Sequence, residues 1–319
     1  MRLRRLALQA LFVAALVALA GALYANLTQG LRALGLSLSF DFLRVEAGFG
    51  ISEGPRYQPG DTYARAFWVG VANTLRVSAL GIVGATILGA LIGVARLSSN
   101  WLVRRLATAY VEAVRNVPLL LQLLFWYGAV FLNLPPVRQA VTWLGVIHIS
   151  QRGVYLPRPV WTGSGVGLEV PVLQGFNFQG GMRLSPEFGA LLLGLTVYTA
   201  AFIAEVIRGA LQSVPRGQWE AAGSLGLTRG QILRLVVVPQ ALRVIVPPLT
   251  SQYLNLTKNS SLAIAIGFPD LFNVGHTILN QTGQSVPVFA MIMGTYLSMS
   301  LFTSLLMNLY NRRVRLVEH

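Results

Sequence analysis

The chain has 319 residues; 54% of them are hydrophobic, only 11% are charged, and the mean hydropathy is +0.59. Soluble domains carry about 25% charged residues, so the composition excludes an ordinary soluble domain and predicts an integral membrane protein. The absence of cysteine excludes disulfides, thiolate metal sites and a cysteine nucleophile. The net charge of +14 does not indicate nucleic-acid binding, because much of the arginine lies in short segments beside apolar runs, where it orients membrane spans.

The first predicted span covers residues 6–25 and follows an arginine-rich start. About 20 helical residues cross a hydrocarbon core of roughly 30 Å, so we expect an uncleaved span whose basic start lies in the cytoplasm. A cleaved signal peptide is the alternative, because residues 18–20 read Ala-Leu-Ala, which resembles a cleavage site.

Two longer polar segments divide the apolar runs. Residues 26–63 combine acidic residues with proline and glycine, which suits an extracytoplasmic loop. We therefore expect an N-terminal span with its loop, 1–63, and a main membrane domain, 64–319, that carries an outer insert, 134–185. The insert is rich in proline, glycine and aromatic residues. Apolar residues with helical spacing between 137 and 144 predict that part of it is a helix lying along the outer interface.

Six apolar runs predict an all-α bundle of about six spans. In the second run a small residue recurs every four positions, from Gly81 to Gly93, which favours close helix packing. In the fifth run, we expect Pro247 and Pro248 to break the helical hydrogen-bond ladder. The predicted spans are 6–25, 66–95, 106–132, 186–208, 231–256 and 286–310.

Charge and span number predict the same orientation. If the N-terminus lies inside, six spans place the segment 96–105, the hairpin 213–239 and the C-terminus inside as well. Each of these segments is arginine-rich, the C-terminal one through Arg312, Arg313 and Arg315. Both termini are therefore expected in the cytoplasm.

The polar hairpin 213–239 carries local signals for a short helix and a turn. Ser213 and Pro215 are helix-start signals, and residues 219–225 form about two turns. Gly226 suits a left-handed helix end, and Thr228 with a glutamine three residues later predicts a capping box for the next helix.

The hairpin resembles the EAA loop in the membrane subunits of bacterial ATP-binding-cassette (ABC) importers. The family pattern, EAA-x3-G-x9-I-x-L-P, is met at every spacing, with valine at the two aliphatic positions. In that family the short helix docks into a groove on the cytoplasmic ATPase and transmits its movement. An ordinary solvated helix-turn-helix is the alternative. The residues that the resemblance places in the coupling loop are Gly217, Trp219, Glu220, Ala221, Ala222, Gly226 and Pro239.

Four further stretches are similar to polar amino-acid permeases of the general L-amino-acid and glutamate/glutamine/aspartate systems. They read VEAVRNVPLLLQL, FNFQGGMRLSPEF, TAAFIAEVIRGALQSVPRGQWEAA and LTSQYLNLTKNSSLAIAIGFPDL. The resemblance implies the type I ABC importer transmembrane-domain fold and inward transport of polar or acidic L-amino acids across the bacterial inner membrane. It also implies a second permease, identical or related, two ATPase subunits and a periplasmic amino-acid-binding protein.

The chain itself is not expected to be an enzyme or to bind a cofactor. A Walker A loop needs Gly-Lys-Ser/Thr, but the single lysine, Lys258, follows a threonine, so ATP and magnesium belong to a partner. The three histidines lack metal-ligand spacing, and no catalytic grouping is predicted. An ABC importer for another small polar solute and a secondary transporter or channel are the alternative functions.

Polar residues inside the apolar runs are candidates for the substrate path. Two Glu-x-x-Arg pairs each place opposite charges on one helix face, near the cytoplasmic side; charge neutralisation there is the structural alternative. A polar stretch after the fifth span could meet a substrate carboxylate, or its lysine could extend to the outer interface. The path candidates are Asn73, Glu112, Arg115, Asn116, Glu205, Arg208, Lys258, Asn259 and Ser260.

Overall fold

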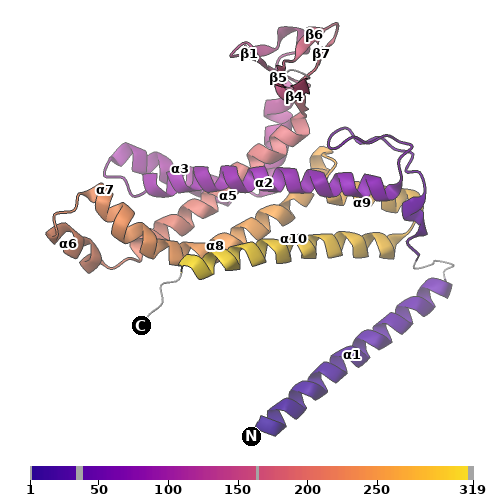
Figure 1. Cartoon of the computed structure of the whole chain (residues 1–319), viewed down its shortest axis with the longest axis horizontal. Coiled ribbons are helices and arrows are strands. Elements are labelled where there is room, and N and C mark those ends of the chain that lie inside the picture. The colour runs from indigo at the N-terminus through magenta and orange to yellow at the C-terminus, as the bar shows by residue number, and fades with distance from the viewer. Residues whose placement is uncertain (1, 34–38, 163–164, 315–319) are drawn as a thin grey trace.

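A computed structural model describes residues 2–33, 39–162 and 165–314. Long helices form an elongated bundle, and a small β-structure projects from its side (Figure 1). Arg315, which contributes to the charge pattern of the C-terminus, lies outside the described residues. The long helices of the bundle are α2 (Tyr63–Ala95), α5 (Pro186–Gln212), α8 (Val238–Asn259) and α10 (Ser285–Val314).

The described helices confirm a bundle of about six spans. Five are long and apolar enough to cross a membrane, and a bent pair brings the number to as many as six. The run expected at 6–25 belongs to α1 (Arg2–Ala33), whose described side chains are almost all exposed and which stands apart from the bundle (Figure 1).

The run expected over 106–132 is broken in the structure into two helical segments. The chain bends by 103° between α3 (Trp101–Asn116) and the following helical segment, Leu119–Asn133. Val117 precedes a proline and is extended, with φ −102° and ψ 127°, because proline disfavours the helical conformation of the residue before it. The segment after the bend comprises α4 (Leu119–Phe125), the π-turn η2 (Trp126–Val130) and the 3₁₀ turn η3 (Phe131–Asn133).

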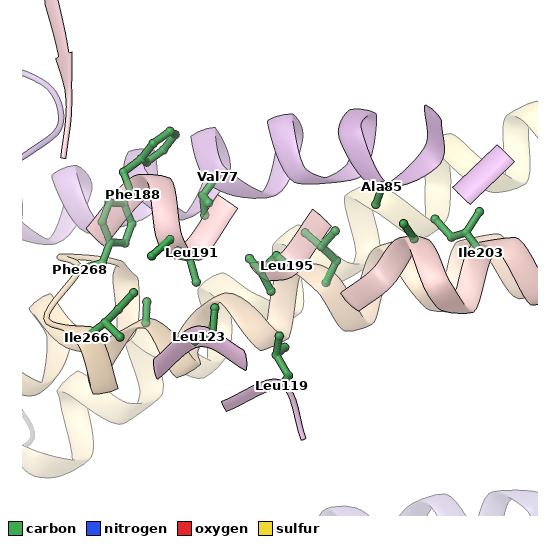
Figure 2. Packing of buried hydrophobic residues seen from close by; sticks show 14 residues of the cluster. Val77, Ala85, Leu119, Leu123, Phe188, Leu191, Leu195, Ile203, Ile266 and Phe268 are labelled. Carbon is green, nitrogen blue, oxygen red and sulfur yellow. The ribbon is translucent and has the colours of Figure 1, made fainter. Parts of the chain in front are cut away.

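The small-residue stripe of α2 packs against α5, as its spacing predicts. A Cβ at Gly89 would lie 2.7 Å from the Ile203 side chain, and one at Gly93 would lie 2.9 Å from the Ala204 carbonyl oxygen. Only a residue without a side chain allows this approach. Figure 2 shows the buried apolar side chains between α2, α5 and α4, with Leu195 among them.

The fifth span is one run with an irregular start. A short helix, α7 (Arg229–Ile232), passes through a π-turn, η5 (Leu233–Val237), into α8. Pro239 lies in the first turn of α8 and has no N–H to donate backward. The helix α8 continues through Pro247 and Pro248, and because neither proline has an N–H, the hydrogen-bond ladder is interrupted there without ending the helix.

The outer insert is β-structure, so the expected helix over 137–144 is wrong. Only a 3₁₀ turn, η4 (Val137–Gln139), precedes the first strand, and Leu144 and Gly145 both take positive φ to form a hairpin turn. Strands β1, β2, β3 and β8 form one antiparallel sheet in that order, and β4–β5 and β6–β7 are separate hairpins. The strands are Val141–Trp143, Ile147–Ser150, Gly153–Leu156, Arg158–Thr162, Gly165–Glu169, Val172–Gln174, Asn177–Gln179 and Met182–Leu184, from β1 to β8.

Short helical segments of the described chain also lie between the predicted spans. A 3₁₀ turn, η1 (Asp41–Arg44), begins the loop before α2. A second 3₁₀ turn, η6 (Ser260–Ile266), follows α8 and leads to α9 (Leu271–Thr282). With 12 residues, α9 is too short to cross a bilayer, and it packs beside the first half of α2 (Figure 1).

Candidate functional site

The hairpin between α5 and α7 forms one end of the bundle (Figure 1). Its short helix, α6 (Arg216–Ser224), is followed by a turn at Gly226, whose φ is +79°. Leu227 N–H donates to the Ala222 carbonyl (3.3 Å) and Gly226 N–H donates to the Gly223 carbonyl (2.9 Å). These two bonds make a Schellman motif, which satisfies carbonyls at the helix end. The predicted short helix and glycine turn are confirmed.

The next helix begins as its sequence predicts. Thr228 and Gln231 form a capping box, in which the Thr228 N–H donates to Gln231 Oε1 at 2.9 Å. The interpretation of Ser213 as a helix-start signal is wrong. Ser213 is the C-terminal cap of α5, and its hydroxyl donates backward to the Ala210 carbonyl (2.8 Å). Pro215 alone precedes α6 directly.

One face of α6 is buried and the other is free. Ala222 is buried and Trp219 is half-buried, and both pack in an apolar cluster with Ile232 on α7. Glu220 and Ala221 lie outside this cluster and are exposed, as are Gly217 and, on α8, Pro239. Leu225, the residue before the glycine turn, is 81% exposed. An exposed leucine, alanine and carboxylate on a fixed short helix form a compact surface that a partner groove can receive.

A cavity of about 780 Å³ lies behind the hairpin. Trp219, Glu220 and Arg229 line it on the hairpin side, and Val94 and Leu97 line it at the end of α2.

The two Glu-x-x-Arg pairs differ in the structure. Glu205 and Arg208 form an ion pair on α5, and Arg96, the residue that ends α2, joins the same carboxylate. Arg208 also donates to Gln212 Oε1 at 2.6 Å. Arg96 is the residue that sequence reasoning missed; its only signal was its place as the first arginine after the second span.

The other pair is not an ion pair in the described part of the chain. Glu112 and Arg115 are both exposed on α3, and the Arg115 guanidinium lies over the Phe202 ring, 5.1 Å from its centroid. Asn116 is the last residue of α3.

The remaining candidates lie toward the other end of α2. Asn73 is fully buried, and its Nδ2 donates to the carbonyls of Glu53 and Pro269, each at 2.9 Å. It precedes Arg96 by 23 positions, or about 35 Å along a helix. The structure therefore does not gather the path candidates at one point.

The polar stretch after the fifth span makes local contacts. Lys258 is exposed and Asn259 is half-buried at the end of α8, whereas Ser260 is buried and donates to the Thr257 carbonyl at 2.8 Å. Among the described residues no group of three or more His, Cys, Asp or Glu side chains is placed to hold a metal ion.

Comparison with known proteins identifies relatives over most of the chain. The family described as binding-protein-dependent transport system inner membrane component matches residues 82–316. The putative amino-acid ABC transporter permease protein YhdX of Escherichia coli is 47% identical over 97% of this chain and 94% of its own. The general L-amino acid transport system permease protein AapQ of Rhizobium johnstonii is 45% identical over 88% of this chain and 84% of its own.

A third relative and a solved structure extend the comparison. The glutamate/glutamine/aspartate/asparagine transport system permease protein BztB of Rhodobacter capsulatus is 37% identical over 97% of this chain and 92% of its own. A crystal structure of an amino acid ABC transporter with histidines has a chain that is 28% identical, with a TM-score of 0.57, over 79% of this chain and 95% of its own.

Proposed function

Because the chain belongs to the family of binding-protein-dependent transport system inner membrane components, we propose that it carries L-amino acids, polar or acidic ones, into the cell. It is a multi-pass membrane permease of the ABC-importer type and not an enzyme. The amino-acid substrate is supported by the names of its relatives, which cover general L-amino acids and the glutamate, glutamine, aspartate and asparagine group.

The observation that carries the proposal is the construction of α6. Its inner face is fixed by Ala222 and Trp219, while Glu220 and Ala221 on α6 and Leu225 just after it remain exposed beside the turn at Gly226. We assign this exposed face to the groove of a cytoplasmic ATPase. Closure of an ATPase dimer on ATP then moves α6, and α5 and α7, which flank it, pass the movement into the bundle.

The complete importer in this proposal contains four membrane or cytoplasmic subunits. Two permeases, identical or related, form one path at their interface, and each engages one ATPase that holds the ATP and magnesium. A periplasmic amino-acid-binding protein delivers the substrate on the outer side. With six spans and arginine-rich inner segments, both termini of this chain lie in the cytoplasm in this proposal.

We place the inner gate at the cluster of Arg96, Glu205 and Arg208. The Glu205 carboxylate is shared by two guanidiniums, so each charge of the cluster has an opposite partner. It also joins the end of α2 to α5, close to the hairpin. Secondary candidates for the path, for which the geometry offers less support, are Asn73, Glu112, Arg115, Asn116, Lys258, Asn259 and Ser260.

The proposal is tested by uptake of labelled amino acids into liposomes that contain the permease with its ATPases and binding protein. We expect ATP-dependent uptake of polar or acidic L-amino acids. Glu220→Lys reverses the charge on the docking face, and the loss of a charge-assisted contact predicts that uptake falls about tenfold or more.

The matched control is Glu46→Lys, which reverses an exposed carboxylate in the loop before α2 and is expected to leave uptake unchanged. Import of a different polar solute in place of amino acids would overturn the substrate. Uptake that persists without any ATPase would overturn the importer and favour a secondary transporter or channel. If a complex that contains Glu220→Lys still hydrolyses ATP in step with transport, the docking role of α6 is wrong.

A further inference from the structure

A second cavity lies beside the first half of α2, the half farther from the hairpin and on the predicted outer side. It has a volume of about 510 Å³, within the usual range for small-molecule sites. The loop before α2 arches back to reach the start of α5 (Figure 1), and the cavity lies between that loop, α2 and the base of the β-insert. Its charged lining consists of Glu53, Arg76, Arg158 and Arg183.

Glu53 is held in the cavity by contacts on both sides. Its carbonyl accepts from Asn73 (2.9 Å), and its Oε2 accepts from the Ser185 backbone N–H (3.2 Å). The next residue, Gly54, has a φ of +119°, and a Cβ there would lie 2.6 Å from Asn73 Oδ1. The loop is therefore fixed against α2 by a contact that only glycine allows.

One carboxylate oxygen of Glu53 has no hydrogen-bond partner. The side chain is only 6% exposed, and Oε1 is buried without a donor among the described residues. Its nearest cation is Arg76, at 4.0 Å from Nη2 to Oε1, which is too long for a hydrogen bond. A buried acceptor left without a donor is costly, so this oxygen is placed to receive a donor from a ligand. Burial also raises the pKa of the Glu53 carboxyl, which a bound cation would oppose.

The arginines are positioned to bind an anion. The Arg76 guanidinium lies over the Phe188 ring, 5.4 Å from its centroid, and Arg183 donates from Nε to the Arg152 carbonyl at 2.9 Å. Each contact fixes the side chain and leaves guanidinium N–H groups that fit a carboxylate in two places. Arg158 has a carboxylate partner of its own, Glu169 at 2.7 Å.

We propose that this cavity is an outer binding subsite for a zwitterionic α-amino acid. Glu53 Oε1 accepts from the ligand ammonium, and Arg76 and Arg183 donate to its α-carboxylate. The charges of the cavity match both ends of the common amino-acid backbone and leave the side chain of the ligand unspecified. The inference rests on the proposed import of amino acids and adds a site that a substrate meets before it reaches the membrane path.

The test measures binding of labelled L-glutamine to the permease–ATPase complex in lipid nanodiscs, without the binding protein. N-acetyl-L-glutamine lacks the ammonium and L-glutamine α-amide lacks the α-carboxylate, and both are expected to bind the wild-type complex more weakly than L-glutamine does. Glu53→Gln keeps an acceptor for Ser185 but removes the charge. Glu53→Gln and Arg183→Gln are each expected to weaken L-glutamine binding about tenfold or more.

Arg138→Gln is the matched control, because Arg138 is an arginine of the insert that lies over Phe176 and does not line this cavity. It is expected to bind like the wild type, and unchanged melting temperatures show that the variants fold. Wild-type binding in Glu53→Gln and Arg183→Gln overturns the subsite. So does a loss of affinity for the binding protein with amino-acid binding intact, since the cavity then receives a protein side chain.

Uptake measured in parallel separates this inference from the proposed function. If the complex imports amino acids but its L-glutamine binding does not depend on Glu53, only the subsite is contradicted. If it imports none and yet binds L-glutamine through Glu53, only the proposed import is contradicted. If it does neither, both are contradicted.

Discussion

Asn73 is a buried amide that joins three segments of the chain. Its side chain on α2 holds the loop at Glu53 and the turn at Pro269, and its neighbour Thr74 accepts from the Leu271 backbone at the start of α9. These bonds satisfy backbone groups that are removed from water where the loops meet the helix. The contacts of Asn73 therefore fix the outer end of the bundle.

Asn73→Ala is expected to lower the free energy of unfolding by about 1–3 kcal/mol, because two carbonyl groups lose their donor in a buried place. The melting temperature of the permease in nanodiscs measures the effect. Asn280→Ala removes an exposed amide on α9 and is the control, with an expected change within about 0.5 kcal/mol. Equal melting of the two variants would contradict the role of Asn73.

The sequence allowed one half of the charged cluster to be predicted. Glu205 and Arg208 are three residues apart, so their pairing follows from the helical period. Arg96 is 109 positions from Glu205, and only the close packing of α2 on α5 brings it there. The Glu112–Arg115 pair has the same spacing and no ion pair, because α3 leaves both residues exposed and Arg115 packs on an aromatic ring.

Among the elements, α6 and its turn are the ones whose boundaries depend most fully on residues nearby in the sequence. Pro215 before it, the Schellman bonds at Gly226 and the capping box at Thr228 each depend on residues within six positions of one another. The hairpin was therefore predictable from sequence alone. The insert was not, because its sheet pairs β3 with β8 across a long stretch of chain, and short apolar runs do not distinguish a helix from a strand.

Gly226→Ala and Gly230→Ala are expected to change stability in opposite directions. A Cβ meets open space at both positions, but Gly226 has a left-handed φ of +79°, which costs other residues about 1–2 kcal/mol. Gly230 lies within α7, where alanine is favoured by about 0.5–1 kcal/mol. Melting of the purified permease gives the sign for each variant.

ATPase activity stimulated by the binding protein tests the same turn in the assembled importer. We expect Gly226→Ala to weaken this stimulation and Gly230→Ala to preserve it. If Gly226→Ala is as stable and as well coupled as the wild type, the left-handed turn is not what holds α6 in place.

At the scale of the whole molecule, the described connections between spans lie alternately at the two ends of the bundle, as the predicted inner and outer segments require. The turn after α2 and the hairpin of α6 lie toward one end of the bundle, and α9 lies toward the other (Figure 1). Hydropathy predicted these spans because each is long and apolar. It did not predict the bend at Val117 or the position of α9, which depend on proline sterics and on tertiary contacts.

The absence of cysteine in the native sequence makes the topology directly testable. An exposed thiol is provided by a single cysteine in place of Ser99, Gln151 or Ser224. Ser99 and Gln151 lie in polar turns, and Ser224 is at the end of α6. We expect a membrane-impermeant maleimide to label Gln151→Cys in intact cells, and Ser99→Cys and Ser224→Cys only after the inner membrane is opened. Labelling of Ser224→Cys from outside would contradict the predicted orientation, because α6 would then lie on the side of the membrane opposite to a cytoplasmic ATPase.

The glycine contacts between α2 and α5 also limit how the bundle can change shape. Ile203 and the Ala204 carbonyl occupy the space where side chains of α2 would otherwise lie, so sliding one helix along the other would drive these groups into the flanking residues. Shear between the two helices is therefore disfavoured, and the pair is expected to rotate as one rigid unit. A displacement at Arg96 would then reach Glu53 as a tilt of α2, with the flexion confined to less tightly interlocked places such as the bend before Pro118.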